Sequence, residues 1–335
     1  MKIFVLILFA FFTVNIQSQI SDFKDINFVK ADNVAKLNEG ENLYNLPLLT
    51  HKLIYKLNTD VEKFRAIYTW ICNNIKGDYN MHTKVSRQRK KLKNDSISFL
   101  RWNQLYKKKV FKTLLRNKKT MCTGYAYLIK EMAKIANIEC KIVDGYARTV
   151  TSNINSLEMA NHSWNAVKLN NKWYLCDATW SSGYMNENSM FIKEFNDGYF
   201  LTEPNLFIKN HYPLDKKWIL NTSETSESFI NSPLVYSEIF KYKIIPTLPS
   251  KMSFDIKKNK EVDFIFKALT NNTIHKISLV SFFNTEEKTY KIYNIKKENG
   301  LLSFKCRFTK KGLYDIHLKI GNDIVATYTI KVTKS

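Results

Sequence analysis

Two neighbouring stretches decide the fold, TMCTGYAYLIKEMAKIANIECKIVDGYAR at residues 120–148 and NHSWNAVKLNNKWYLCDATW at residues 161–180. In the first stretch, Cys122 opens a run whose apolar residues recur on one helical face. This spacing predicts a helix that begins at the cysteine. The β-branched residues of 138–147 then predict a strand.

The second stretch predicts a hairpin. Alternating runs at 162–169 and 172–180 flank Asn170 and Asn171, a dipeptide suited to the left-handed positions of a two-residue turn. A helix that carries a cysteine and packs on such an antiparallel sheet gives an α+β core.

The register of this hairpin places a histidine beside a carboxylate. If the asparagines form the turn, Leu169 pairs with Lys172 and Trp164 lies opposite Asp177. His162 is then on the same face as Trp164 and diagonal to Asp177, with the two Cα atoms about 7–8 Å apart. That separation is within reach of a His–carboxylate hydrogen bond, whereas a one-residue slip would put the two on opposite faces.

The placement of Cys122 favours a reactive thiol. A helix N-terminus stabilises a thiolate, Lys118 and Lys119 add positive charge, and the free N–H groups suit an oxyanion. Taken alone, a cysteine at a helix start is more often structural than reactive. The predicted pairing of His162 with Asp177 changes that balance, because a held imidazole is ready to take the thiol proton.

Other cysteines, histidines and acids are weaker candidates. Cys176 neighbours Asp177 and faces the other way, and a Cys140–Cys176 bridge is possible. Asp144 is a weaker candidate for the orienting carboxylate. Two further cysteines are expected to be buried, and five histidines without comparable partners to be structural or exposed: Cys72, Cys306, His51, His82, His211, His275 and His317.

Charge is concentrated in one segment. The formal net charge is +22, and the segment from Lys84 to Lys119 holds fourteen Lys and Arg against one acid, Asp95. Such a segment attracts anionic cell-surface components, although a solvated helical surface is the simpler interpretation. The sequence has no nucleic-acid-binding motif, so nucleic acid is not an expected partner.

The N-terminus reads as an export signal. Lys2 precedes an apolar run at residues 3–14, and Ser18 stands near a predicted cleavage point, which gives a signal peptide at 1–19. The run is shorter than the roughly 20 residues of a membrane crossing, and an uncleaved anchor is the alternative. We therefore expect a periplasmic or secreted protein with no transmembrane span after signal removal.

Two domains follow the signal. A capping box at Thr59 and Glu62 predicts a helix of about 16 residues in a catalytic domain at 20–240, whose core is 60–220. Prolines near 241–251 indicate a linker. Short β-rich runs beyond it, one of them at 289–295, predict an antiparallel, immunoglobulin-like sandwich at 241–335.

Together these residues resemble the core of the transglutaminase-like superfamily, and within it the branch around kyphoscoliosis peptidase. The likeness covers roughly residues 60–220. Three features carry it: HSWNAVKL before KWYLCDATW at 162–180, FRAIYTWICNNIKGDY at 64–79, and GYFLTEPNLFIKNHYPLDKKWIL at 198–220.

The resemblance implies a papain-like site with Cys122 as nucleophile, His162 as base and acid, and Asp177 as the residue that orients the imidazole. In related enzymes an upstream side chain completes the oxyanion hole, and Trp102 or Gln104 is the candidate here. Two tryptophans flank the site as candidate walls of a substrate groove, Trp164 first and Trp180 second.

The expected function is an exported thiol enzyme that acts on amide or peptide bonds, a cysteine peptidase or amidase with a protein or peptide substrate. Two alternatives stay open. One is a protein-glutamine acyltransferase, and the other is an inactive scaffold that binds surfaces through the basic segment and the sandwich. Hydrolysis is preferred because the sequence has no EF-hand pattern for a calcium-dependent cross-linker. No cofactor and no metal are expected.

Overall fold

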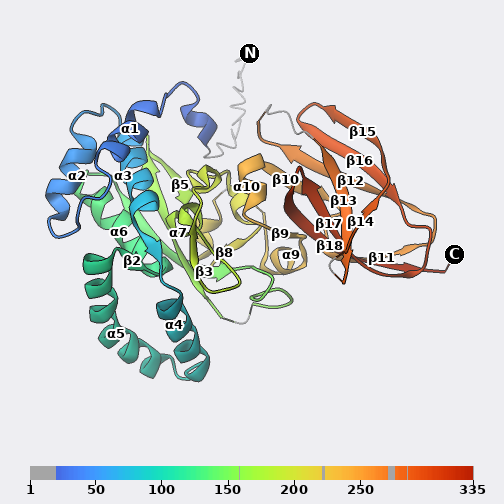
Figure 1. The fold of residues 1–335 in the computed structure, drawn as a ribbon, viewed down its shortest axis with the longest axis horizontal. Coiled ribbons are helices and arrows are strands. Elements are labelled where there is room, and N and C mark those ends of the chain that lie inside the picture. Colours follow the sequence, from blue (N-terminus) through green and yellow to red (C-terminus); the bar gives the residue numbers. More distant parts are fainter. Residues whose placement is uncertain (1–19, 158, 221–222, 271–275, 285, 335) are drawn as a thin grey trace, which may run out of the picture.

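A computed structural model describes most of the chain (Figure 1). The predicted signal peptide and His275 lie outside the described residues, which are 20–157, 159–220, 223–270, 276–284 and 286–334. Within these ranges, no helix is both long and apolar enough to cross a membrane.

The first half of the chain is a four-stranded antiparallel sheet in the order β5-β4-β3-β8, with helices packed on one face. The strands and their helices are β3 (Cys140–Ala147), β4 (His162–Leu169), β5 (Lys172–Cys176), β8 (His211–Pro213), α1 (Val29–Leu37), α2 (Leu46–Ile54), α3 (Asp60–Asn74) and α6 (Cys122–Ile135). The mixed α+β core predicted from the sequence is therefore confirmed.

Helix α3 begins where its sequence predicts. The Thr59 side chain accepts from the Glu62 backbone N–H, and the Glu62 carboxylate accepts from the Thr59 N–H at 3.0 Å. The buried guanidinium of Arg65 then pairs with Asp32 of α1 and with Asp197. These contacts fix α1 and α3 against the helical face of the sheet.

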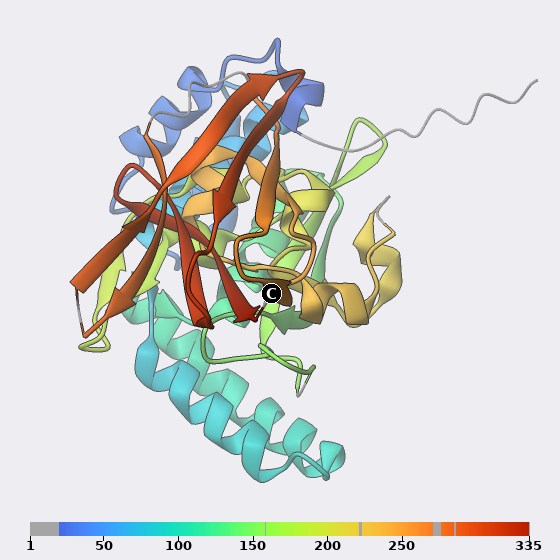
Figure 2. The same cartoon turned by 90° about the vertical axis from the view of Figure 1, so that its right-hand side faces the viewer.

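Helices α4 (Tyr79–Lys91) and α5 (Ser96–Asn117) form a hairpin that projects from the core, as Figures 1 and 2 show. Asp78 and Asp95 cap their N-termini by accepting backbone N–H bonds. The basic segment is thus helical along both arms, as a helical surface requires.

Short elements connect the sheet to the rest of the molecule. β1 (Lys76–Gly77) pairs with β2 (Lys119–Thr120) at the base of the hairpin, and β6 (Gly183–Met185) pairs with β7 (Phe191–Lys193). The remaining helices are α7 (Ala178–Ser182), α8 (Pro204–Phe207), α9 (Ser226–Asn231) and α10 (Glu238–Tyr242).

The C-terminal region is a β-sandwich of two facing sheets. One sheet has the order β10-β12-β16-β15, and the other β11-β18-β17-β13-β14, with β9 beside β18. The strands are β9 (Leu234–Val235), β10 (Ile244–Leu248), β11 (Ser253–Lys257), β12 (Glu261–Ala268), β13 (Ile277–Phe283), β14 (Glu286–Tyr290), β15 (Ile292–Glu298), β16 (Leu301–Arg307), β17 (Gly312–Ile320) and β18 (Asp323–Thr333).

Three details of the sandwich differ from the sequence expectation. The run expected as one strand at 289–295 divides where the chain crosses between sheets, so that Tyr290 ends β14 and Ile292 begins β15. β11 pairs with β18 in parallel, not antiparallel. The predicted linker is wrong at its centre, because β10 pairs with β12 and buries Ile244 and Ile245.

One apolar core joins the sandwich to the outer face of the first sheet. It contains Trp164 and Leu175 from β4 and β5 together with Phe240, Phe264 and residues of β18. β9 adds to this connection, because it follows the N-terminal region along the chain and pairs with β18 of the sandwich. The sandwich is therefore packed directly against the sheet that carries the predicted histidine.

Candidate active site

The turn between β4 and β5 has the conformation that the sequence predicts. Asn170 and Asn171 have φ angles of 47° and 62°, and Leu169 pairs with Lys172. β5 ends at Cys176 and not at residue 180, because Asp177 begins α7 and accepts the Thr179 N–H at 2.8 Å. The register that brings His162 toward Asp177 is confirmed.

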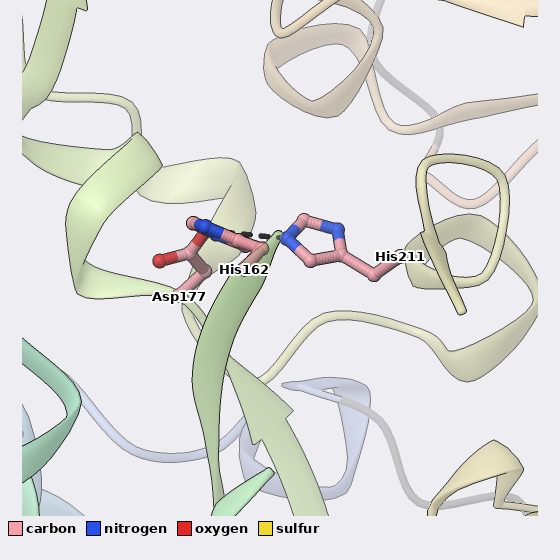
Figure 3. Close-up of side chains that lie close together, drawn as sticks. All are labelled: His162, Asp177 and His211. Atoms are coloured by element: carbon pink, nitrogen blue, oxygen red, sulfur yellow. Dashed lines mark hydrogen bonds and ion pairs between the residues drawn. The ribbon is translucent and has the colours of Figure 1, made fainter. Parts of the chain in front are cut away.

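His162 and Asp177 are in direct contact. The His162 Nε2 and the Asp177 Oδ2 are 2.7 Å apart, and both side chains are buried (Figure 3). Because Asp177 occupies Nε2, the ring has Nδ1 left for the thiol of Cys122, which lines the same cavity as His162.

Cys122 is the first residue of α6, as predicted. Its helix has Met121 at the N-cap, so no side chain of that residue caps the first N–H groups. Burial opposes ionisation of the thiol, but the neighbouring His162, the positive charge of Arg89 and the Ser163 N–H lower its pKa. The cation near the sulfur comes from Arg89 on α4, whereas Lys118 donates to the Gly40 carbonyl.

Sequence reasoning missed a second histidine on Asp177. The His211 Nε2 lies 3.1 Å from the same Oδ2, so the expectation that His211 has no comparable partner is wrong (Figure 3). Tertiary pairing decides this contact, because Ala147 of β3 pairs with His211 of β8, 34 residues beyond Asp177. Its only sequence signal was a place in the 198–220 stretch that carries the family resemblance.

The three groups have opposed pKa shifts. Burial disfavours charge on all of them, yet the carboxylate of Asp177 raises the pKa of His162 above its ordinary value. The charge and the hydrogen bonds of the two histidines hold the pKa of Asp177 well below its usual range. Burial lowers the pKa of His211 to about 4 despite Asp177. His162 is therefore the cationic imidazole and His211 the neutral one.

A cavity of about 350 Å³ opens onto the thiol and the imidazole. Its walls come from the base of α4, the start of α6, α7, β6 and β9. Three lining side chains, Thr120, Arg148 and Thr179, each have a buried polar atom with no hydrogen-bond partner among the described residues. Such atoms are rare in folded proteins, and here all three belong to residues that line the cavity.

The two candidate tryptophans have exchanged roles. Trp164 is 1% exposed and packs against Phe207 and His211 in the core shared with the sandwich, so its assignment as a groove wall is wrong. Trp180 lines the cavity and stacks on His162 with ring centroids 5.1 Å apart. The sandwich covers the face that Trp164 would otherwise present to substrate.

The proposed oxyanion-hole side chains do not reach the site. Trp102 packs inside the α4–α5 hairpin with Met81 and Val110, and Gln104 is exposed on α5. Neither residue lines the cavity, because the hairpin carries them away from the core. The backbone N–H that acts on the sulfur is that of Ser163 on β4, and no Met121 side chain caps the first N–H groups of α6.

The remaining candidates of the sequence analysis have structural places. All five cysteines are free and buried, so no Cys140–Cys176 bridge is formed. Burial raises the pKa of the Cys140 and Cys176 thiols, which sets them apart from Cys122. Asp144 accepts a hydrogen bond from Ser163 and does not orient His162.

His162, Asp177 and His211 are also residue types that bind metals, and their ligand atoms lie within 4.8 Å of one another. The separations of 2.7 and 3.1 Å are hydrogen-bond distances. A tetrahedral ion with bonds of about 2.0–2.1 Å needs its ligand atoms roughly 3.3 Å apart. The cluster in this form fits a hydrogen-bonded carboxylate better than a metal centre.

Comparison with known proteins finds sequences similar to the core. The family described as "Transglutaminase-like superfamily" matches residues 48–178, which include Cys122, His162 and Asp177. Kyphoscoliosis peptidase of Mus musculus is 33% identical over 206 residues, 60% of this chain and 28% of that protein. Hillarin of Drosophila melanogaster is 26% identical over 232 residues, 65% of this chain and 26% of that protein.

Among solved structures, the Lin-41 filamin domain is 10% identical over 24% of this chain and 84% of that chain, with a TM-score of 0.20. The chain spans about a quarter of the length of the two curated relatives it matches. The likeness to kyphoscoliosis peptidase supports that branch of the superfamily.

Proposed function

From the transglutaminase-like domain at residues 48–178, we propose an exported thiol hydrolase that cleaves amide or peptide bonds through Cys122. In this proposal His162 transfers the proton, Asp177 orients His162, and Trp180 contacts the substrate. The N-terminal sequence supports the export part of the proposal.

One observation carries the proposal. The imidazole of His162 is held by Asp177 at 2.7 Å and lines the same cavity as the thiol of Cys122 at the start of α6. This order of nucleophile, base and orienting acid is the arrangement that activates a thiol for attack on a carbonyl.

The groups support a two-step reaction. The Cys122 thiolate bonds to the carbonyl carbon, the backbone N–H groups of α6 stabilise the oxyanion, and the C–N bond breaks. The departing nitrogen takes its proton from His162, which leaves a thioester. His162 then accepts a proton from water as the water oxygen attacks the thioester carbon. The C–S bond breaks, which releases the carboxylic acid product and frees Cys122.

Hydrolysis is preferred to transfer onto an amine for two reasons. The relative with 33% identity is named a peptidase, which supports cleavage. The sequence also has no EF-hand pattern of the kind that a calcium-dependent cross-linker uses. An amine acceptor that enters the same cavity would convert the chemistry to acyl transfer.

The test is labelling of the chain by a peptide-based electrophile that reacts with thiols, followed by mass spectrometry. We expect one labelled site, Cys122, with no label in Cys122→Ala and weaker label in His162→Ala. Incubation with a peptide panel, with and without added amine, then separates hydrolysis from transfer. A Cys122 that reacts no faster than a free thiol in solution contradicts the proposal.

A further inference from the structure

The α4–α5 hairpin is the most unevenly charged part of the chain. Residues 84–119 carry fourteen Lys and Arg and one acid, so 14 − 1 = 13 of the net +22 charges lie in this segment. Among the described residues, none of these fourteen side chains forms an ion pair with a carboxylate. The positive potential of the hairpin is therefore not neutralised locally.

The inside of the hairpin is filled by apolar side chains. Met81 and Val85 of α4 pack with Val110 of α5, and Trp102 and Tyr106 close the same cluster. With these positions occupied, the basic side chains of α4 and α5 are exposed, except for Arg89, which acts on the thiol of Cys122. Figure 2 shows both helices extending away from the sheet and the sandwich, so their outer surfaces face solvent.

Large apolar side chains interrupt the basic surface of α5. Ile97, Leu100 and Leu105 are 64%, 60% and 75% exposed. Ile97 precedes Lys108 by eleven residues, and Leu105 precedes Lys108 and Lys112 by three and seven, so these four share a face. Leu100 follows Ile97 by three residues and lies at the edge of that face. A cationic helix face that also exposes leucine and isoleucine is the pattern of helices that lie in a membrane interface.

From the charge and the exposed apolar side chains together, we propose that the outer face of the α4–α5 hairpin docks the protein on an anionic lipid bilayer. Lysines at the surface attract the acidic headgroups, and Ile97, Leu100 and Leu105 enter the headgroup boundary. A polyanion without an apolar phase, such as an acidic polysaccharide, would use the lysines and leave the three apolar side chains in water.

Docking would also fix the position of the catalytic cavity relative to the bilayer. Asp78, Tyr79 and His82, at the base of α4, line the same cavity as Cys122. A hairpin bound to a bilayer therefore holds the cavity at a set distance from the surface. The inference goes beyond the proposed reaction and does not depend on it, because binding is measured without turnover.

The experiment is co-sedimentation of the full chain with vesicles of phosphatidylcholine, with and without phosphatidylserine. The charges of three exposed lysines of α5 are reversed together in K108E/K109E/K112E. The matched control, K258E/K310E/K311E, makes the same change of six charge units on the sandwich. A third variant, I97S/L100S/L105S, keeps every charge. Residues 1–19 are the same in all four proteins, so any binding by that apolar run is common to them.

We expect wild-type chain and sandwich control to bind the anionic vesicles alike, and K108E/K109E/K112E to bind about tenfold or more weakly. Binding should fall as salt rises from about 0.1 M to about 1 M, because the Debye length shortens from about 10 to about 3 Å. I97S/L100S/L105S should lose vesicle binding while its retention on heparin, a soluble polyanion, stays unchanged.

Two results overturn the proposal. Equal loss in both charge-reversal variants means that the total charge of the molecule, and not the hairpin, drives binding. Full vesicle binding by I97S/L100S/L105S means that the ligand is a polyanion and not a bilayer. Circular dichroism and Cys122 labelling establish that each variant is folded, since none of the substituted residues lines the catalytic cavity.

Discussion

The catalytic cluster of His162, Asp177 and His211 and the α4–α5 hairpin differ in how their charges are paired. In the cluster, Asp177 is 1% exposed and has two imidazoles within 3.1 Å, so each charge has a fixed partner. The hairpin segment at residues 84–119 carries thirteen net charges, most of them on exposed side chains, without a carboxylate partner among the described residues. Buried charge acts over one hydrogen bond and resists salt, whereas exposed charge acts over a Debye length and is screened.

The largest expected effect comes from removing the charge at the centre of the cluster. Asp177→Asn should lower the second-order rate of Cys122 labelling by about a hundredfold or more, because a neutral amide no longer stabilises the cationic His162 imidazole that accompanies the thiolate. Asp144→Asn is the matched control on the same sheet and should stay within about threefold of wild type. Equal effects would mean that the buried pair has no special role.

A pH titration tests how the cluster lowers the pKa of the Cys122 thiol. Since His162 lowers the pKa of Cys122, the wild-type labelling rate should rise through a midpoint below about 8.5, the ordinary thiol value. In His162→Ala the thiolate loses its partner, so the midpoint should move upward and labelling at pH 7 should fall about tenfold. Coincident titration curves for the two proteins would contradict the coupling.

The second histidine tests whether Asp177 needs both partners. His211→Phe removes one hydrogen bond from a buried carboxylate and should raise the pKa of Asp177, with about a five- to tenfold loss of labelling. His211→Gln keeps a side-chain donor and should recover part of the rate. A purely structural role predicts instead that His211→Phe lowers the midpoint of thermal unfolding and leaves the pH profile of labelling unchanged.

The smallest effect is expected on the hairpin. K108E/K109E/K112E should change the labelling rate of Cys122 by no more than about twofold at 0.15 M salt, where the Debye length is about 8 Å. Labelling at two salt concentrations checks this. A fivefold change in the labelling rate that disappears at high salt would show that the charge of the hairpin acts on the thiol. The two regions would then not be electrostatically independent.

Local patterns made several features predictable. The capping box at Thr59 fixed the start of α3, and the Asn170-Asn171 turn fixed the register that joins His162 to Asp177. In each case the interacting atoms lie a few residues apart along the chain, or are related by the two-residue period of a strand. The domain boundary near residue 240 and the export signal remain predictions.

Non-local contacts were not predictable in the same way. Trp164 shares a strand face with His162, as the period requires, but the sandwich covers that face and leaves Trp180 to line the cavity. α1 and α2 in the first sixty residues lacked a clear pattern, although Asn45 caps α2 by accepting the Leu48 N–H. Their stability comes from packing against α3 and not from sequence periodicity.

The sequence by itself determined the helix that begins at Cys122, the hairpin that carries His162 and Asp177, and the charge of the hairpin segment, because each depends on neighbours or on a short period. Only the tertiary structure decided that His211 shares Asp177, that Arg89 rather than Lys118 acts on the thiol, and that Trp164 is buried. Those contacts join segments far apart in the chain, and their distances are set when separate elements pack around a common core.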